Sequence, residues 1–372
     1  MPDTHGQNGT LCAWLRKDGA RSPETAHCIF LSIMPHERTV PALLWLFVLL
    51  TLCSYLINAL TLWGLGRSDN PSWEPRLALL KNLILSDILQ SSNSGPAVIY
   101  SLLQRRTVRL NSWCLVQYFL GSLTIFSSLV TITLMALERY LYVCHAIHYL
   151  VILTPVRMRV ALLLIWVYAT VVSAANLILL NMGQLHPHEE VTRGLLCEPD
   201  TVEQVMGFPR AAAVYRKITG SLTLLLCLLA YAFSYVRMYR DARNAVIPFN
   251  AANTTARKTV LFYCGMLFVQ LLPVLIKVIS DALWEVEGTA AMVELLPPSD
   301  KRGGTAPSAT AAAMHVSLLV MLVVPPCINP LVFGLRNVEI RHVLLGRIRC
   351  LRGANARMIR EDMGRAHRAQ AG

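Results

Sequence analysis

Three strongly polar residues interrupt long apolar stretches of this sequence, where their side chains would be costly to bury. Asn58, Asp87 and Asn329 each lie well inside such a stretch, and a polar group inside a membrane helix needs a partner or a function. A carboxylate at the depth of Asp87 must pair with a cation, bind a metal ion or take up a proton. With Ser128 as a further oxygen ligand, these residues predict a polar relay or a sodium site. Asn58 and Asn329 are equally well explained as hydrogen-bonding links between helices.

The tripeptide Glu138-Arg139-Tyr140 ends another apolar stretch, which runs without a charge from Leu110 to Leu137. An Arg side chain is permanently charged, and its planar fork binds several oxygen partners. By itself the tripeptide carries little weight, because basic residues are common where a membrane helix meets the cytoplasm.

The elements that must position these residues are membrane helices. Of the 372 residues, 54% are hydrophobic and only 15% are charged, against about 25% charged in soluble domains. A bilayer requires about 20 mostly apolar residues per helix, and backbone groups in lipid must bond within the helix. Seven stretches are long enough: residues 41–65, 77–103, 110–137, 160–182, 218–236, 259–276 and about 310–335. We predict an all-α membrane protein with a seven-helix bundle.

The net charge of +12 is unevenly distributed over the two sides of this bundle. The N-terminal tail and the loops on its side carry equal numbers of acidic and basic residues, so the other side carries the whole surplus. Positive loops stay in the cytoplasm, which places the N terminus outside. The surplus then faces anionic lipid headgroups and an intracellular partner, not nucleic acid. We expect an extracellular tail (1–40), a transmembrane domain (41–335) and a cytoplasmic amphipathic helix with a basic tail (336–372).

Four cysteines lie on the predicted outer side, where disulfides persist. Cys114 begins the third span and Cys197 lies in the long second outer loop, so a bond between them would fix that loop over the bundle. Three pairings of the four are possible, and we favour Cys114–Cys197 with Cys12–Cys28. Asn8 begins a glycosylation sequon on the same side.

The segment from Arg336 to Leu351 has apolar residues near helical spacing, with arginines between them. This pattern predicts a short helix that lies on the inner leaflet of the membrane. Cys350 within it is a candidate for palmitoylation.

Taken together, these motifs resemble those of the rhodopsin-like G protein-coupled receptors. The resemblance rests on seven spans with the N terminus outside, on Asp87 at the end of Asn82–Asp87, on Glu138-Arg139-Tyr140, and on Asn329–Phe333. The last segment is similar to the NPxxY motif of the family, with Phe333 in place of Tyr.

The resemblance implies a mechanism in which Glu138 holds Arg139 while the receptor is inactive. Binding of an agonist would open helix six and release Arg139 toward Tyr235 and a heterotrimeric G protein. Tyr140, Asn329, Pro330 and Phe333 would belong to the same switch. Because Phe333 lacks the hydroxyl of Tyr, we expect a weaker polar network there in the active state.

Further motifs resemble those of the odorant receptors. Arg139–Tyr149 is similar to their RYxAICxPLxY motif, with Ala146 in place of Pro, and Ser234-Tyr235 and the run from Pro326 to Glu339 fit the same group. Ala256–Leu261 resembles the divergent odorant-receptor-like proteins of fishes. The resemblance covers about residues 41–350, and it implies a stimulatory, olfactory-type G protein and a place in the plasma membrane.

Two departures concern the subfamily. The sixth span carries Phe268–Pro273 in place of the CWxP or TCxSH patterns, and the second outer loop has one cysteine where odorant receptors have several. Gly121 stands where amine receptors carry Asp, and Val323 stands where opsins carry the retinal-binding Lys. The chain is therefore expected to be neither an aminergic receptor nor an opsin.

The expected ligand pocket is apolar with a few hydroxyls, which suits a small organic molecule. Its candidate residues on the third span are Tyr118, Gly121, Ser122, Ile125 and Phe126. Helix packing explains at least half of them equally well. Lys277, at the outer end of the sixth span, would bind an acidic ligand or extend toward the headgroups.

Three alternatives stay open at this point. A rhodopsin-like receptor for a ligand other than an odorant differs only in its pocket. A transporter or channel is the second alternative, but transporters tend to show internal repeats, and none is evident. An intramembrane enzyme would need a pair of catalytic groups within the spans, but Asp87 is the only membrane Asp and His315 has no evident partner. We expect no enzymatic activity and no cofactor.

Overall fold

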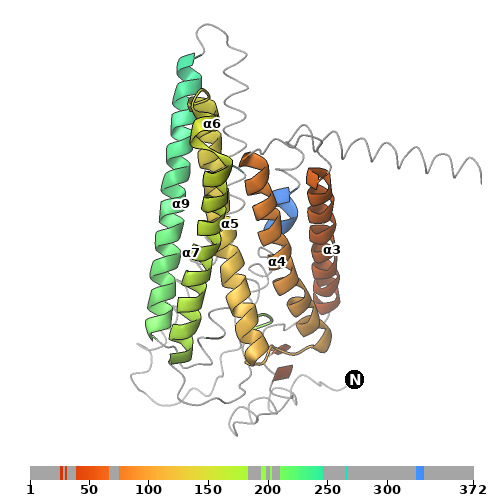
Figure 1. Ribbon diagram of the computed structural model, residues 1–372. Helices are drawn as coiled ribbons and strands as arrows, with labels where there is room; N and C mark the ends of the chain where they lie inside the picture. Colours follow the sequence, from red (N-terminus) through yellow and green to blue (C-terminus); the bar gives the residue numbers. More distant parts are fainter. Residues whose placement is uncertain are drawn as a thin grey trace, which may run out of the picture.

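The computed structural model describes residues 26–27, 30–31, 39–66, 75–182, 194–197, 202, 210–245, 265 and 324–330. Within these residues the chain forms long helices that run alongside one another (Figure 1). They are α3 (Thr39–Gly66), α4 (Pro75–Gln104), α5 (Ser112–Cys144), α7 (Pro155–Met182) and α9 (Arg210–Ala245), with a single-turn helix α6 (Tyr149–Ile152) between α5 and α7. The first five predicted spans each coincide with one of these long helices. The sixth span and most of the seventh lie outside the described residues.

Hydropathy explains why these segments are helices of this length. In α3, α5, α7 and residues 211–241 of α9, mean hydropathy over the most apolar window lies between 1.7 and 2.3, and each is long enough to cross a bilayer. Each helix extends beyond its predicted span at one end or both, and α9 extends the furthest, because hydrogen bonding within a helix does not stop where the apolar stretch ends. Helix α4 is more polar, and its polar side chains face its neighbours.

Helix α5 lies at the centre of the described bundle. It packs against α4, α7 and α9, whereas α3 packs on the far side of α4, an order that Figure 1 shows from α9 on the left to α3 on the right. One apolar cluster joins Leu79 and Leu83 of α4 to Ile132 and Met135 of α5 and to Met158 of α7. The outward faces of the helices carry exposed Leu, Val and Ile side chains, as expected of surfaces that meet lipid.

Four separate segments of the chain meet at one end of the bundle. Phe30, Phe47, Val98 and Leu195 are buried in one cluster there. The Ser101 hydroxyl donates a 2.9 Å hydrogen bond to the carbonyl oxygen of Leu195. We call this the disulfide end, and the opposite end, where α5 finishes, the Glu138 end.

Candidate functional site

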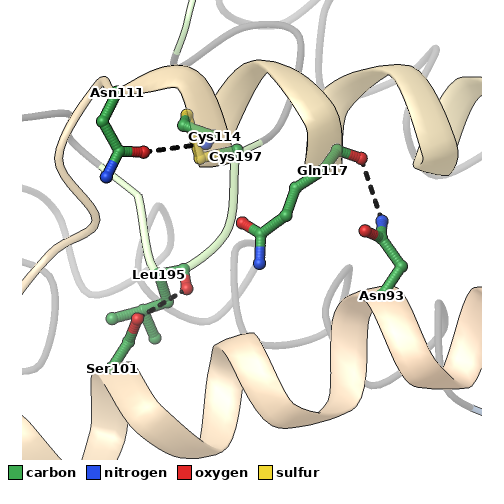
Figure 2. Close-up of a disulfide and its surroundings, with 7 residues drawn as sticks. All are labelled: Asn93, Ser101, Asn111, Cys114, Gln117, Leu195 and Cys197. Atoms are coloured by element: carbon green, nitrogen blue, oxygen red, sulfur yellow. Dashed lines mark hydrogen bonds between the residues drawn. A yellow bond between two sulfur atoms is a disulfide. The ribbon is translucent and has the colours of Figure 1, made fainter.

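At the disulfide end, Cys114 and Cys197 are bonded to each other (Figure 2). Asn111 caps α5 here, because its side-chain oxygen accepts a 2.8 Å hydrogen bond from the Cys114 amide. The disulfide ties the segment 194–197 to the first turn of α5. The predicted Cys114–Cys197 pairing is therefore confirmed, while Cys12 and Cys28 lie outside the described residues.

A line of buried polar contacts runs between α4 and α5, and we call it the polar seam. Asn93 Nδ2 donates to the Gln117 carbonyl oxygen at 2.9 Å (Figure 2). The Thr124 hydroxyl donates to Gln90 Oε1. Further along, the seam consists of the Ser86–Ser127 hydroxyl contact at 3.0 Å and the bond from Asn82 Nδ2 to Thr131 Oγ1 at 2.8 Å. These contacts explain why α4 carries so many buried polar residues, since hydrogen bonds to α5 supply the partners that lipid does not offer.

Residue Ser127, not the expected Ser128, faces α4 at the level of Asp87. Ser127 is fully buried against Ser86, whereas Ser128 is half-buried. One residue along a helix rotates the side chain by about 100°, so the two serines face different directions. Ser127 is therefore the serine of the polar seam, and Ser128 as an ion ligand stays a prediction.

Asp87 is buried and meets the last described segment of the chain. Asn329 Nδ2 lies 3.3 Å from both carboxylate oxygens of Asp87. Asn58 Nδ2 donates instead to the backbone oxygens of Pro326, at 2.9 Å, and Ser54, at 2.8 Å. Residues 324–330 are thus held from both sides, by α3 through Asn58 and by α4 through Asp87. Asn58 serves as a link between helices here, and its bonds do not reach the Asp87 carboxylate.

At the other end, the Glu138 carboxylate is buried and holds three partners. Arg139 Nε lies 3.8 Å from Glu138 Oε2, as the tripeptide suggested. The Tyr149 hydroxyl of α6 donates a 2.7 Å hydrogen bond to Oε1, and Arg76 Nε of α4 lies 3.5 Å from the same oxygen. Sequence reasoning missed these two contacts, and we call the four residues the Glu138 cluster.

Aromatic side chains surround this end. Tyr140 contacts His145 Nε2 through its hydroxyl at 3.1 Å and packs edge-on against Phe233 of α9. Tyr235 is buried and stacks on Tyr231, with ring centroids 4.4 Å apart, against Ala136 of α5. The candidate switch residue Tyr235 therefore lies on the face of α9 that meets α5.

The candidate pocket residues of α5 divide into two groups. Tyr118, Ser122 and Phe126 lie one turn apart and contact α7: Tyr118 accepts a hydrogen bond from Asn176, Ser122 accepts one from Ser173 at 3.0 Å, and Phe126 meets Tyr168 edge-on at 6.2 Å. These contacts favour helix packing for these three residues. Ile125 is 40% exposed, and Gly121 lies beside Asn93 of α4.

Several predicted site residues fall outside the described part of the chain. They are Asn8, Lys277, Phe333 and Cys350. Pro330 is described and is buried at the end of the helical segment 324–330.

Comparison with known proteins assigns the family. Residues 37–333 match the 7 transmembrane receptor (rhodopsin family), a region that includes the disulfide, the polar seam and the Glu138 cluster. The chain belongs to the rhodopsin family of seven-transmembrane receptors. Its fold is therefore the seven-helix transmembrane bundle predicted from the sequence, and the transporter and enzyme alternatives are excluded.

Olfactory receptors are distant relatives. The chain is 24% identical over 343 residues to olfactory receptor 5AN1 of Homo sapiens, an alignment that covers 88% of this chain and 96% of that protein. It is 25% identical over 280 residues to olfactory receptor 1G1 of Gorilla gorilla gorilla, covering 74% of this chain and 80% of that one. A third relative, olfactory receptor-like protein OLF4 of Canis lupus familiaris, is 24% identical over 85% of this chain and 94% of its own length.

Proposed function

We propose that this receptor binds a small organic ligand of the odorant class inside its helix bundle and activates a heterotrimeric G protein of the stimulatory, olfactory type. The observation that supports this best is the buried Glu138 carboxylate beside Arg139. An Arg held by a carboxylate at a helix end is a charged group that a change of packing can release. The released fork then binds backbone or side-chain oxygens of a partner.

Two features support an odorant ligand. The relatives that cover most of the chain are olfactory receptors, and the motif residues from Arg139 to Tyr149 are similar to theirs. A receptor for another small organic ligand is the second candidate, because the sixth span carries Phe268–Pro273 where odorant receptors have a different pattern. We retain two pocket residues of α5, Gly121 and Ile125. We also retain Lys277 for the case in which the ligand is acidic.

The orientation of the chain follows from its charge. The side opposite the N terminus carries the surplus of basic residues, so we infer a plasma-membrane receptor whose N terminus and disulfide end are extracellular. Residues 1–40 form the outer tail, with Asn8 as a glycosylation site. Residues 41–335 form the receptor domain, and residues 336–372 form the inner amphipathic helix with Cys350 as its lipid anchor.

The remaining roles concern the switch. Asp87 and Asn329 form a polar relay that repacks between inactive and active states, with Asn58 holding the same segment from α3. Tyr235 receives Arg139 after its release. Pro330 and Phe333 belong to the end of the seventh span that moves with this change.

A cyclic AMP reporter screen against a panel of small organic compounds tests this function. Cells that express the receptor should respond to at least one compound class in a dose-dependent manner. The Arg139→Ala variant should lose this response while its surface level, measured by antibody labelling of intact cells, stays within about twofold, because a substitution at the Glu138 end leaves most of the bundle contacts intact. Normal signalling by Arg139→Ala would remove Arg139 from the mechanism.

A further inference from the structure

The buried Glu138 carboxylate has two cationic neighbours among the described residues. Arg139 Nε lies 3.8 Å from Oε2, and Arg76 Nε lies 3.5 Å from Oε1. The Tyr149 hydroxyl donates its 2.7 Å hydrogen bond to Oε1 as well. Only 2% of the Glu138 side chain is exposed, so water is poorly placed to substitute for a lost partner.

Arg76 also lies over an aromatic ring. Its Cζ lies 4.7 Å from the centroid of the Tyr142 ring, within the range of a cation–π interaction. The Tyr142 ring in turn meets the Tyr149 ring edge-on, with centroids 5.3 Å apart. Arg76 is the second residue of α4, while Tyr142 lies one turn beyond Glu138 on α5, so three elements fix one guanidinium beside one carboxylate.

A buried carboxylate that loses its cation is strongly destabilised. If Arg139 were the only cation, its release would leave Glu138 uncompensated, and this cost would oppose activation. Arg76 and Tyr149 contact the other oxygen, Oε1, so neither contact requires Arg139 to be at Oε2.

We propose that Arg76 is a positioning residue of the activation switch: it keeps Glu138 paired when Arg139 is released and so shifts the receptor toward its active state. The proposal rests on the G protein coupling proposed above. Arg76 acts through Glu138, and its contribution is to lower the cost of the state in which Arg139 is free.

The sign of the effect separates this role from a purely structural one. A contact that merely held the inactive bundle together would, when removed, loosen the bundle and strengthen G protein binding. If Arg76 has the positioning role, its loss leaves Arg139 as the cation that compensates Glu138. Release of Arg139 then costs more, and G protein binding is weakened. The Arg76→Lys variant keeps the positive charge and should keep most of the wild-type strength of G protein binding, because the ammonium also compensates the carboxylate.

Titration of the receptor with G protein, in the absence of any ligand, shows whether a substitution at Arg76 weakens or strengthens G protein binding. Full-length receptor in lipid nanodiscs is titrated with purified heterotrimers of each Gα class after removal of nucleotide. We expect the apparent Kd to rise about tenfold in Arg76→Met, since the binding-competent fraction falls, and to stay within about threefold of wild type in Arg76→Lys.

Two further variants serve as controls. Glu138→Gln should bind the G protein more tightly than wild type. Lys81→Met removes an exposed cation from the same helix and should leave the Kd unchanged. Unchanged or tighter binding by Arg76→Met would overturn the proposal.

A thermal double-mutant cycle on Arg76→Met and Glu138→Gln tests the ion pair independently of any G protein. We expect the two shifts in apparent Tm to deviate from additivity by about 2 °C or more, and additive shifts would also overturn the proposal. If the cycle shows coupling but no heterotrimer binds any variant, including Glu138→Gln, the proposed G protein function is wrong and the role of Arg76 in it falls too. The two failures are therefore distinguishable.

Discussion

Gly95 of α4 lies against Thr51 of α3 with no room for a side chain between them. A Cβ atom at Gly95 would meet both Thr51 Cγ2 and Oγ1 at 2.7 Å and Thr51 Cβ at 3.3 Å. Because Thr51 is β-branched and buried, rotation about its χ1 brings one heavy atom into place as another leaves. The helices can therefore approach this closely only where α4 has glycine.

We expect Gly95→Ala to destabilise the receptor by about 1–3 kcal/mol, the usual cost of overpacking. The measurement is the apparent Tm of purified receptor in detergent. Gly220→Ala is the matched control, because a Cβ there meets nothing within 4 Å and alanine favours the helix by up to about 1 kcal/mol.

Among the described residues, Thr51 Oγ1 finds no hydrogen-bond partner, so Thr51→Ala should cost little. Combined with Gly95→Ala it should restore most of the lost Tm. A Gly95→Ala receptor as stable as wild type would show that α3 and α4 separate without cost.

The sequence alone identified some of the site residues. Those that it missed make contacts between different helices. Cys114 and Cys197 were predictable because one begins the third span and the other lies in the outer loop above it. Glu138 and Arg139 were predictable because they are neighbours in a motif. Arg76 reaches Glu138 from another helix, and no local pattern encodes a contact between segments that far apart. Ser128 was chosen over Ser127 because α5 has polar side chains on several faces, so periodicity does not select one.

At the scale of elements, hydropathy located the spans, while polar contacts decide how they pack. The junction of α4, α5 and α7 is an example. Asn82 Nδ2 donates to Thr131 Oγ1 of α5 at 2.8 Å, and Asn82 Oδ1 accepts from Trp166 Nε1 of α7 at 2.8 Å. One buried amide therefore joins three helices. The sequence places Asn82 in the second span, but it does not show which helices it joins.

Asn82→Leu should lower the free energy of unfolding by about 1–2 kcal/mol, because two interhelical hydrogen bonds are lost and the Trp166 N–H is left without its acceptor. The apparent Tm of purified receptor measures the loss. Tyr55→Phe removes a hydrogen bond to Ser92 between α3 and α4 that lies at an exposed position, and it should change the Tm much less.

A variant with Trp166→Phe added to Asn82→Leu gives a second test of the junction. Once Asn82 is gone, the Trp166 N–H has no bond to lose, so the second substitution should cost less than it does in wild type. Equal costs in both backgrounds would mean that the two side chains contribute independently.

At the scale of the whole molecule, the polar contacts connect the two ends of the bundle. The polar seam descends from Asn93 and Gln117 near the disulfide to Asn82 and Thr131, and the Glu138 cluster closes the far end of the same pair of helices. An agonist shifts such a bundle only by binding one packing more tightly than another. We expect Asp87 to be a group at which a second ligand biases the same equilibrium, because its partner Asn329 belongs to the seventh span.

The Asp87 carboxylate needs compensation beyond the neutral amide of Asn329. Both carboxylate oxygens lie 3.3 Å from Asn329 Nδ2, while Lys81 on the same helix is exposed and is directed to the headgroups by its own hydration. Because no ion pair with Asp87 is present among the described residues, we expect a bound sodium ion or a proton to supply the counter-charge. Sodium would hold α4 and the seventh span together in the inactive packing, and an agonist would have to displace it.

We therefore expect agonist potency to fall at least about fivefold as sodium replaces an inert organic cation at fixed ionic strength, which is the low end of typical coupling between two sites. Asp87→Asn should remove this dependence, because the amide cannot bind the cation. Ser92→Ala, an exposed position on the same helix, should retain it. Potency that follows pH but not sodium would assign the counter-charge to a proton. A wild-type response indifferent to sodium would exclude the ion site and leave Asp87 with only the role of joining α4 to the seventh span.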